Sequence, residues 1–393
     1  MKIGLVSSEI PPKINAGSVR MESFIDCWKE KENTELVVFT EANSKKEDVD
    51  YGDNVKMIRT LCKRASNKNG IIFRILSEIL LSILILLKLL KSNVDIYFVS
   101  SPSFLLTISV LIASKIKSTP YIVDVRDIYP QVLFDNQIIS SKGIMGRFLI
   151  KLEKMIYNNS LRVITVTKGL KKHIERKSKK RVCLIRNGVD TETFKRKEYM
   201  KDDSNFIILF HGTLGRCQDI DLIIEYANYL KENDINDIKI WIIGDGPKKS
   251  KILNSIKKSN LENILKYYGF KHISEIPDYI NKSDIGFSPR KMGLINETAF
   301  PVKVYEYMGC GIPIIISPKS EVGEFVENNN IGFQVKGSKE LKKLHNYVLK
   351  LKNNKEIYKN YSDNSLQTST QFDRFKLANK LYQIITQIDE EAT

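Results

Sequence analysis

Short, continuous apolar runs alternate with longer helical patterns along almost the whole chain, and this alternation constrains the fold more than any other feature. The runs occupy residues 3–7, 36–40, 96–100, 121–125 and 162–166, and then residues 206–210, 238–244, 284–288 and 312–316. Runs that are largely continuous in apolar residues, rather than alternating with polar ones, are typical of parallel strands covered by helices on both faces. Two such sets predict an α/β protein with two doubly wound, Rossmann-like domains.

The length of the chain, 393 residues, also favours two domains over a single core. Residues 195–205 are polar and have no apolar periodicity, so the division is expected there. We predict an N-terminal domain over residues 1–198, a C-terminal domain over 199–372 and a terminal segment over 373–393. An amphipathic helix is expected in that terminal segment, at residues 373–388.

The net charge of +16 is concentrated in residues 1–200, which carry 35 Lys and Arg against 21 Asp and Glu. Such a half can face an anionic partner: nucleic acid, an anionic membrane surface or a phosphorylated acceptor. A generally lysine-rich composition is the simpler alternative. No recognisable nucleic-acid-binding motif organises the charge, so nucleic acid is not expected as a partner.

The cysteines and the hydropathy indicate where the protein is located. Five scattered cysteines without a CxxC pair favour a reduced cytoplasmic compartment, with neither a disulfide framework nor a zinc site. No uncharged segment is long enough for a transmembrane helix. Two helical patterns, residues 71–92 and 141–159, are either domain helices or helices lying in the interface of an anionic membrane.

Two glycine-rich turns follow strands of the second set. The sequence HGTLGRCQD places Gly212, Gly215 and Arg216 between a strand and a helix, and GDGP places Gly244 in the next such turn. Backbone amides and a helix N-terminus can bind phosphate there, and the planar guanidinium of Arg216 also suits phosphate. Tight strand-to-helix turns without a ligand are the alternative.

The stretch FPVKVYEYMGCGIPIII, residues 300–316, combines charged groups with a buried strand. Pro301 suits the first turn of a helix, and Gly309 and Gly311 can end it. Lys303 and Glu306 are three residues apart and share one face near the helix start. A carboxylate there can accept hydrogen bonds from ribose hydroxyls while the ammonium offsets phosphate charge. The alternative is an exposed salt bridge of little energetic value.

Two N-terminal segments complete the candidate site. The loop over residues 7–24 contains Gly17 and Arg20, and it can hold a phosphorylated group against a helix N-terminus with Arg20 as the cation. The stretch YIVDVRDIYP places Asp124 and Asp127 at the carboxyl end of a strand. Asp127 can order or deprotonate an acceptor hydroxyl. A structural Asp–Arg pair is the alternative.

These motifs, in this order, resemble family 4 of the retaining glycosyltransferases, which have the GT-B architecture. The resemblance is carried by the PPxxxxG loop, DVRDIYP, RNGVD, FHGTLGRCQD, GDGP and FPVKVYEYMGCGIPII, between residue 3 and about residue 317. It implies two Rossmann-like domains facing a central cleft, with the terminal helix crossing back onto the first domain. The forms of two motifs resemble most closely the members that build surface polysaccharides.

The resemblance also implies residue roles. Glu306 would hold the donor ribose, the turn from Gly212 to Gly215 would approach the diphosphate, and Gly17 would line the cleft from the other domain. Lys303 and Arg216 would neutralise the leaving diphosphate without a metal or other cofactor. A Glu that many members carry eight residues before the ribose-binding one is replaced here by Thr298.

The function that follows is a hexosyltransferase of the cytoplasmic membrane face. It would use a UDP-sugar, with an N-acetylated hexose expected, and a polyprenyl-linked or growing glycan acceptor. A GT-B-like sugar-nucleotide epimerase, which needs no acceptor, is one alternative. A non-enzymatic anion-binding module is another.

Overall fold

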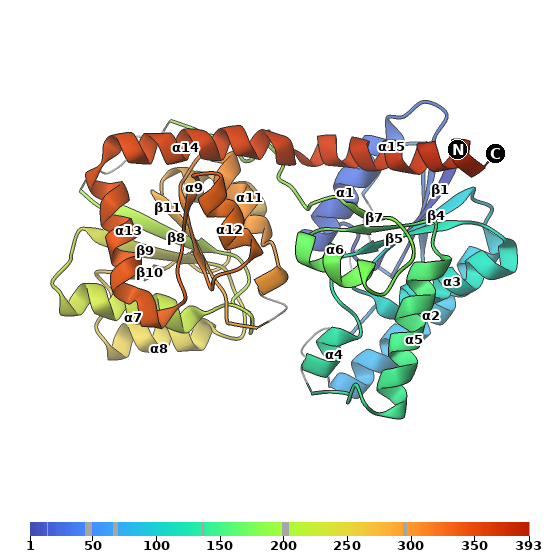
Figure 1. Ribbon diagram of the computed structural model, residues 1–393, viewed down its shortest axis with the longest axis horizontal. Helices are drawn as coiled ribbons and strands as arrows, with labels where there is room; N and C mark the ends of the chain where they lie inside the picture. The colour runs from blue at the N-terminus through green and yellow to red at the C-terminus, as the bar shows by residue number, and fades with distance from the viewer. Residues whose placement is uncertain are drawn as a thin grey trace. The chain divides into compact units, whose positions relative to one another are not determined.

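The computed structural model describes residues 1–13, 15–43, 49–65, 70–135, 137–198, 204–293 and 297–392. The chain divides into two compact units (Figure 1). Unit 1 comprises Met1–Asn187 together with Arg374–Thr393, and unit 2 comprises Gly188–Asp373. Part of the stretch in which the sequence predicts the division, residues 199–203, lies outside the described residues.

The sheet of unit 1 is parallel, and its strands pair in the order β3-β2-β1-β4-β5-β6-β7. The strands are β1 (Lys2–Val6), β2 (Glu35–Thr40), β3 (Val55–Arg59), β4 (Ile96–Ser100), β5 (Tyr121–Val125), β6 (Arg162–Thr165) and β7 (Val182–Leu184). In register, Val6 of β1 lies opposite Phe39 of β2 and Val99 of β4. The sequence predicts every one of these strands except β3 and β7.

The sheet of unit 2 is also parallel, with the order β10-β9-β8-β11-β12-β13. Its strands are β8 (Phe206–His211), β9 (Ile238–Ile243), β10 (Leu265–Tyr267), β11 (Ile285–Pro289), β12 (Ile314–Ser317) and β13 (Gly332–Gln334). The order third-second-first-fourth-fifth-sixth recurs in both units and defines a Rossmann-like sheet. The predicted fold of two such domains is therefore confirmed.

In such sheets, ligands bind outside the carboxyl ends of the strands, where the strand order reverses. That point lies between β1 and β4 in unit 1 and between β8 and β11 in unit 2.

Helices connect most pairs of successive strands within each unit. Unit 1 contains α1 (Ala16–Lys29), α2 (Ile71–Lys91), α3 (Phe104–Lys117), α4 (Gln131–Asp135), α5 (Ile144–Asn159), α6 (Lys168–Glu175) and α15 (Arg374–Ala392). Unit 2 contains α7 (Ile220–Glu232), α8 (Lys249–Lys258), α9 (Ile276–Asn281), α11 (Val302–Gly309), α12 (Glu321–Asn328), α13 (Leu341–Asn353) and α14 (Lys355–Ser369). Side chains that favour the N-cap position start several of these helices, among them Asn15 for α1 and Asp219 for α7.

Helices α1 and α15 cover one face of the unit 1 sheet, and α2, α3 and α5 cover the other (Figure 1). The terminal helix is part of this core, because Ala378, Leu381 and Ile385 are buried in the same cluster as Trp28 of α1. The indole Nε1 of Trp28 also donates a hydrogen bond to the carbonyl oxygen of Ala378 at 3.0 Å. Residues far apart in the sequence therefore complete a single core.

The two faces of the unit 2 sheet are covered by different helices. The apolar cluster on one face includes side chains of α7, α8 and α13, and that on the other face includes side chains of α9, α11 and α12. Tyr307 of α11 fixes its helix to the sheet, because its buried hydroxyl donates to the carbonyl oxygen of Leu209 at 2.9 Å.

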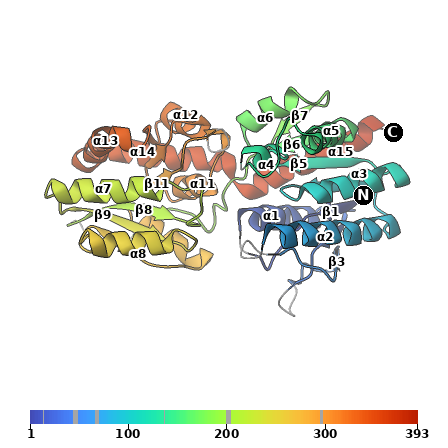
Figure 2. The ribbon, with the colours of Figure 1, turned by 90° about the horizontal axis from the view of Figure 1, so that it is seen from below.

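Helix α2 buries only one side. Leu81, Ile85 and Leu89 lie in the core, whereas the opposite side leaves large apolar side chains exposed. They are Phe73, Ile75, Leu76, Ile79, Leu80, Ile83 and Leu87. Figure 2 shows α3 between α2 and α5. Among the described residues, no helix is both long enough and apolar enough to cross a bilayer.

Candidate functional site

The two glycine turns of unit 2, which contain Gly212 and Gly244, follow the carboxyl ends of β8 and β9, and their backbones are in contact. Gly212 donates a hydrogen bond from its amide to the carbonyl oxygen of Ile243 at 3.0 Å. Gly244 has a φ of +139°, and a Cβ at this position would lie 1.9 Å from the carbonyl oxygen of Gly212. Only glycine satisfies both conditions at residue 244. Gly215 lies further along the first turn, just before α7.

Lys303 of α11 is buried beside the first of these turns. Its Nζ lies 3.7 Å from the centroid of the Phe210 ring and finds no hydrogen-bond partner among the described residues. A Cβ at Gly212 would lie 3.6 Å from Nζ, which places the ammonium against the turn. Burial, followed by the charge of Arg290, lowers the pKa of Lys303 to about 7. A buried ammonium group whose N–H donors have no acceptor is unfavourable, and a bound anion would supply both the opposite charge and the acceptors.

Glu306 lies one turn further along α11 and is also buried, with 7% of its surface exposed. Its Oε2 is 3.3 Å from Nε2 of His211, the last residue of β8. Burial, followed by the charge of Lys303, lowers the pKa of His211 well below its usual value, so this imidazole is neutral at neutral pH. The interpretation of Lys303 and Glu306 as an exposed salt bridge is wrong, because both side chains are buried.

Two further buried polar groups lie at the carboxyl ends of β11 and β12. The hydroxyls of Ser288 in β11 and Ser317 in β12 are about as buried as core side chains, and neither finds a hydrogen-bond partner in the described part of the chain. Sequence reasoning missed both serines and His211. Their common signal is position, because each stands within the last two residues of a parallel strand.

The remaining predicted residues of unit 2 are more exposed than Lys303 and Glu306. Arg216 is exposed in the turn before α7 and makes neither a hydrogen bond nor an ion pair with any other described residue. Thr298 is half-buried in a helical turn that precedes α11. Pro301 caps α11 rather than occupying its first position, and the helix ends at Gly309. Within the described residues, no cluster of three or more His, Cys, Asp and Glu side chains could hold a metal ion.

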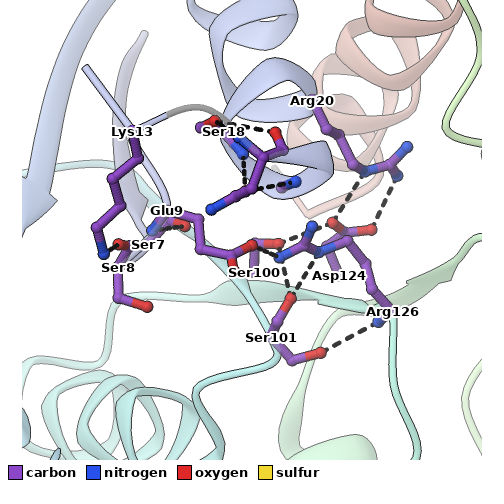
Figure 3. Close-up of polar contacts among 12 residues, drawn as sticks. Ser7, Ser8, Glu9, Lys13, Ser18, Arg20, Ser100, Ser101, Asp124 and Arg126 are labelled. Carbon is purple, nitrogen blue, oxygen red and sulfur yellow. Dashed lines mark hydrogen bonds and ion pairs between the residues drawn. The ribbon is translucent and has the colours of Figure 1, made fainter. Parts of the chain in front are cut away.

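In unit 1, the first turn of α1 lies against the carboxylate of Glu9. Oδ1 of Asn15 accepts hydrogen bonds from the amides of Gly17 and Ser18, at 2.8 and 2.9 Å. A Cβ at Gly17 would lie 1.5 Å from Oε2 of Glu9, and the same oxygen pairs with Nη2 of Arg126 at 2.5 Å (Figure 3). Gly17 therefore makes room for the Glu9–Arg126 pair. Asp127, the next residue along the chain, is exposed.

Arg20 has a structural role, and its prediction as a phosphate-binding cation is wrong. Its Nε and Nη2 donate to the carboxylate of Asp124 at 3.1 and 2.9 Å, and its Nη1 donates to the carbonyl oxygen of Arg186 at 2.8 Å (Figure 3). Only 2% of Arg20 is exposed. The guanidinium fixes α1 to the ends of β5 and β7, which leaves it no surface to offer a ligand.

Two models of known protein families together match most of the chain. Residues 30–193 match the model described as glycosyltransferase family 4, and residues 191–368 match the model described as glycosyl transferases group 1.

Two curated relatives are similar to parts of the chain. An uncharacterized glycosyltransferase of Methanocaldococcus jannaschii is 28% identical over 235 residues, which covers 60% of this chain and 61% of that protein. The amylovoran biosynthesis glycosyltransferase AmsK of Erwinia amylovora is 27% identical over 154 residues, which covers 39% of this chain and 38% of the relative. The chain thus spans less than two thirds of the length of these relatives.

Similarity to solved structures extends over nearly the whole chain. The crystal structure of HepE from Anabaena in complex with UDP aligns with a TM-score of 0.71 and 16% sequence identity, covering 98% of this chain and 99% of that one. At this identity the similarity concerns the fold, and it agrees with the two-domain architecture described above.

Proposed function

Because this chain belongs to the family 4 glycosyltransferases, we propose that it transfers a sugar from a UDP-sugar to a lipid-linked or growing glycan. The product would be a cell-surface polysaccharide, and the sugar an N-acetylated hexose. HepE, the neighbour with the same fold, was crystallised with UDP. AmsK, a relative of part of the chain, is named for the synthesis of a polysaccharide.

The observation that carries the proposal is the buried Lys303, whose ammonium makes no hydrogen bond among the described residues and faces the glycine turn. A diphosphate at this point would accept hydrogen bonds from Nζ and from the amides of Thr213 and Gly215 in the turn, because the amides of Gly212 and Leu214 already donate to the carbonyl oxygens of Ile243 and Asp245. Glu306, three residues along the same helix, would accept hydrogen bonds from the ribose hydroxyls. A nucleoside diphosphate carries both of these groups, and Lys303 and Glu306 are three residues apart on one face of α11.

The same residues account for the chemistry. Negative charge develops on the leaving diphosphate as the glycosidic bond breaks, and Lys303 together with Arg216 would neutralise it in place of a metal ion. The acceptor hydroxyl would attack on the face from which the diphosphate leaves, which retains the anomeric configuration. Its proton would pass to a departing phosphate oxygen. Asp127 would order this hydroxyl from unit 1.

The test is substitution of Glu306 by glutamine, which keeps its shape and removes its charge. We expect the affinity for UDP to fall by about tenfold or more, because the ribose hydroxyls lose a charged acceptor, and transfer to fall with it. Glu324→Gln, an exposed carboxylate of α12, is the matched control. Titration calorimetry with UDP, UDP-N-acetylglucosamine and UDP-glucose measures both variants. Near-normal binding and turnover by Glu306→Gln would contradict the proposal.

The location that we propose is the surface of an anionic membrane, on the exposed side of α2. This side presents the seven apolar side chains described above, and Lys88 and Lys91 stand in the last turn of the helix. Helix α5, on the other side of α3, also has exposed apolar side chains, those of Ile144, Met145 and Phe148. Apolar side chains beside lysines, in the half of the chain that carries most of the positive charge, suit an anionic lipid interface.

Flotation of the protein with vesicles of anionic phospholipid tests this location. Serine at residues 76, 80 and 83 of α2 should abolish flotation while leaving the thermal melt unchanged, because Leu76, Leu80 and Ile83 are about half exposed. Vesicles of neutral lipid are the control for the charge contribution. Equal flotation of the triple variant and the wild type would show that α2 is not the contact.

A further inference from the structure

A second polar site lies in unit 1, at the carboxyl ends of β2 and β3, and its lining includes neither Glu9 nor Arg126. A cavity of about 140 Å³ opens there. Its lining residues are Ile10, Pro12, Lys13, Thr40, Glu41, Ala42, Asn43, Arg59 and Lys63. Pockets that hold whole small molecules measure roughly 300 Å³ or more, so this cavity fits a chemical group rather than a complete ligand.

The charged residues in the described part of the lining are mostly basic. Among the described lining residues, Lys13, Arg59 and Lys63 carry positive charge and Glu41 carries negative charge, with Oε1 of Glu41 2.5 Å from Nζ of Lys13. The guanidinium of Arg59 is held in place by the chain itself, because it donates to the carbonyl oxygens of Glu41 and Pro11 at 3.3 and 3.1 Å. A fixed guanidinium beside two lysines favours an anion with several oxygen atoms.

A buried hydroxyl supplies independent support. Thr40, the last residue of β2, is 1% exposed, and its Oγ1 finds no hydrogen-bond partner in the described part of the chain. Buried hydroxyls are almost always paired, so an unpaired one that lines a cavity points to a group missing from it. A hydroxyl can donate to the same kind of oxygen that attracts the cations.

We propose that this cavity binds a phosphate group, with Arg59 and Lys63 as the cations and the Thr40 hydroxyl as a donor. The phosphate belongs to a phosphorylated acceptor. That identification rests on the proposed function, whereas the anion site itself does not. Unit 1 then recognises the acceptor by its phosphate, and unit 2 recognises the donor through separate residues.

The test measures binding of inorganic pyrophosphate to the full chain by titration calorimetry, with saturating UDP present to occupy the unit 2 site. We expect pyrophosphate to bind without displacing UDP, and the double variant Thr40→Val/Lys63→Gln to weaken this binding at least tenfold. Lys56→Gln, an exposed lysine of β3 outside the cavity, should bind as the wild type does. Unchanged affinity of the double variant, or pyrophosphate that binds only by displacing UDP, would overturn the proposal.

Farnesyl diphosphate and farnesol identify the source of the phosphate. Tighter binding of farnesyl diphosphate than of pyrophosphate, with farnesol inactive, supports a lipid-linked acceptor. Equal binding of the two phosphorylated probes supports a soluble one, and equal binding of farnesol and farnesyl diphosphate contradicts a phosphate site. A chain that binds pyrophosphate through Thr40 and Lys63 but does not bind UDP would refute the proposed function and leave the anion site standing.

Discussion

Binding of UDP to unit 2 should be accompanied by proton uptake, because the buried Lys303 is only partly charged in the unliganded protein. Burial and the charge of Arg290 lower the pKa of this lysine from 10.5 to about 7. A diphosphate against its Nζ supplies opposite charge and hydrogen-bond acceptors, both of which favour the protonated form. The pKa should therefore return towards its usual value in the complex.

The size of the effect follows from these two pKa values. At pH 8 a group with a pKa of 7 is protonated in about 10% of molecules, and full protonation in the complex then takes up about 0.9 proton per UDP. Uptake should fall to about 0.5 at pH 7 and about 0.1 at pH 6, because the lysine is then already charged. Phosphate groups titrate near pH 6, so UDP itself contributes little at pH 8.

Titration calorimetry at pH 8 in buffers of different ionisation enthalpy measures the number of protons taken up. Lys303→Met is the matched variant, since it keeps an unbranched side chain and removes the titrating amine. It should bind UDP more weakly and without the uptake. Two results would refute the reasoning: no uptake by the wild type at pH 8, or the same uptake by the methionine variant.

Three other outcomes are expected. The pKa of Lys303 is lower in the folded than in the unfolded protein, so the free energy of unfolding of the wild type should rise with pH above 7. Lys303→Met has no such titrating amine, and its stability advantage over the wild type in urea unfolding should therefore shrink by about 2 kcal/mol between pH 7 and pH 9. A constant difference would contradict the low pKa. Gly244→Ala should lose at least about 3 kcal/mol of unfolding free energy through its clash with Gly212. Gly293→Ala should lose less, because Gly293 has a similar φ of +141° but a Cβ there would meet no atom of the described residues within 4 Å. Equal losses in thermal melts would show that φ alone matters. Asp127→Asn should lower kcat about a hundredfold with KM for the UDP-sugar unchanged, and an unaltered kcat would remove Asp127 from the chemistry.

The sequence predicts the interior of both sheets but not their edges. All nine predicted strands are present, and the four that were missed, β3, β7, β10 and β13, are the outermost strands of the two sheets. Interior strands are covered on both faces and paired on both sides, so their sequences are mostly apolar. Edge strands such as Val55–Arg59 and Leu265–Tyr267 carry exposed lysines, so they do not form the continuous apolar runs on which the prediction relies.

The sequence predicts which residues share a helix face in the candidate site, but not how deeply they are buried. Spacing places Lys303 and Glu306 on one face of a helix, but spacing alone does not distinguish a buried face from an exposed one. Burial and the low pKa of Lys303 depend on Phe210 and Arg290, which are distant in sequence. Arg20 shows the converse error, because this cation of α1 beside a glycine loop looks available until its partner Asp124, contributed by β5, is known.

Helix α15 has a consequence for the synthesis of the protein. Unit 2 is one uninterrupted segment and can fold on the ribosome, whereas unit 1 waits for Ala378, Leu381 and Ile385 to cover Trp28. Until those residues emerge, the first half of the chain to be translated has an uncovered apolar surface. A premature stop codon just after residue 373 would thus spare the later unit and damage the earlier one, so such a truncated product should aggregate through its N-terminal half.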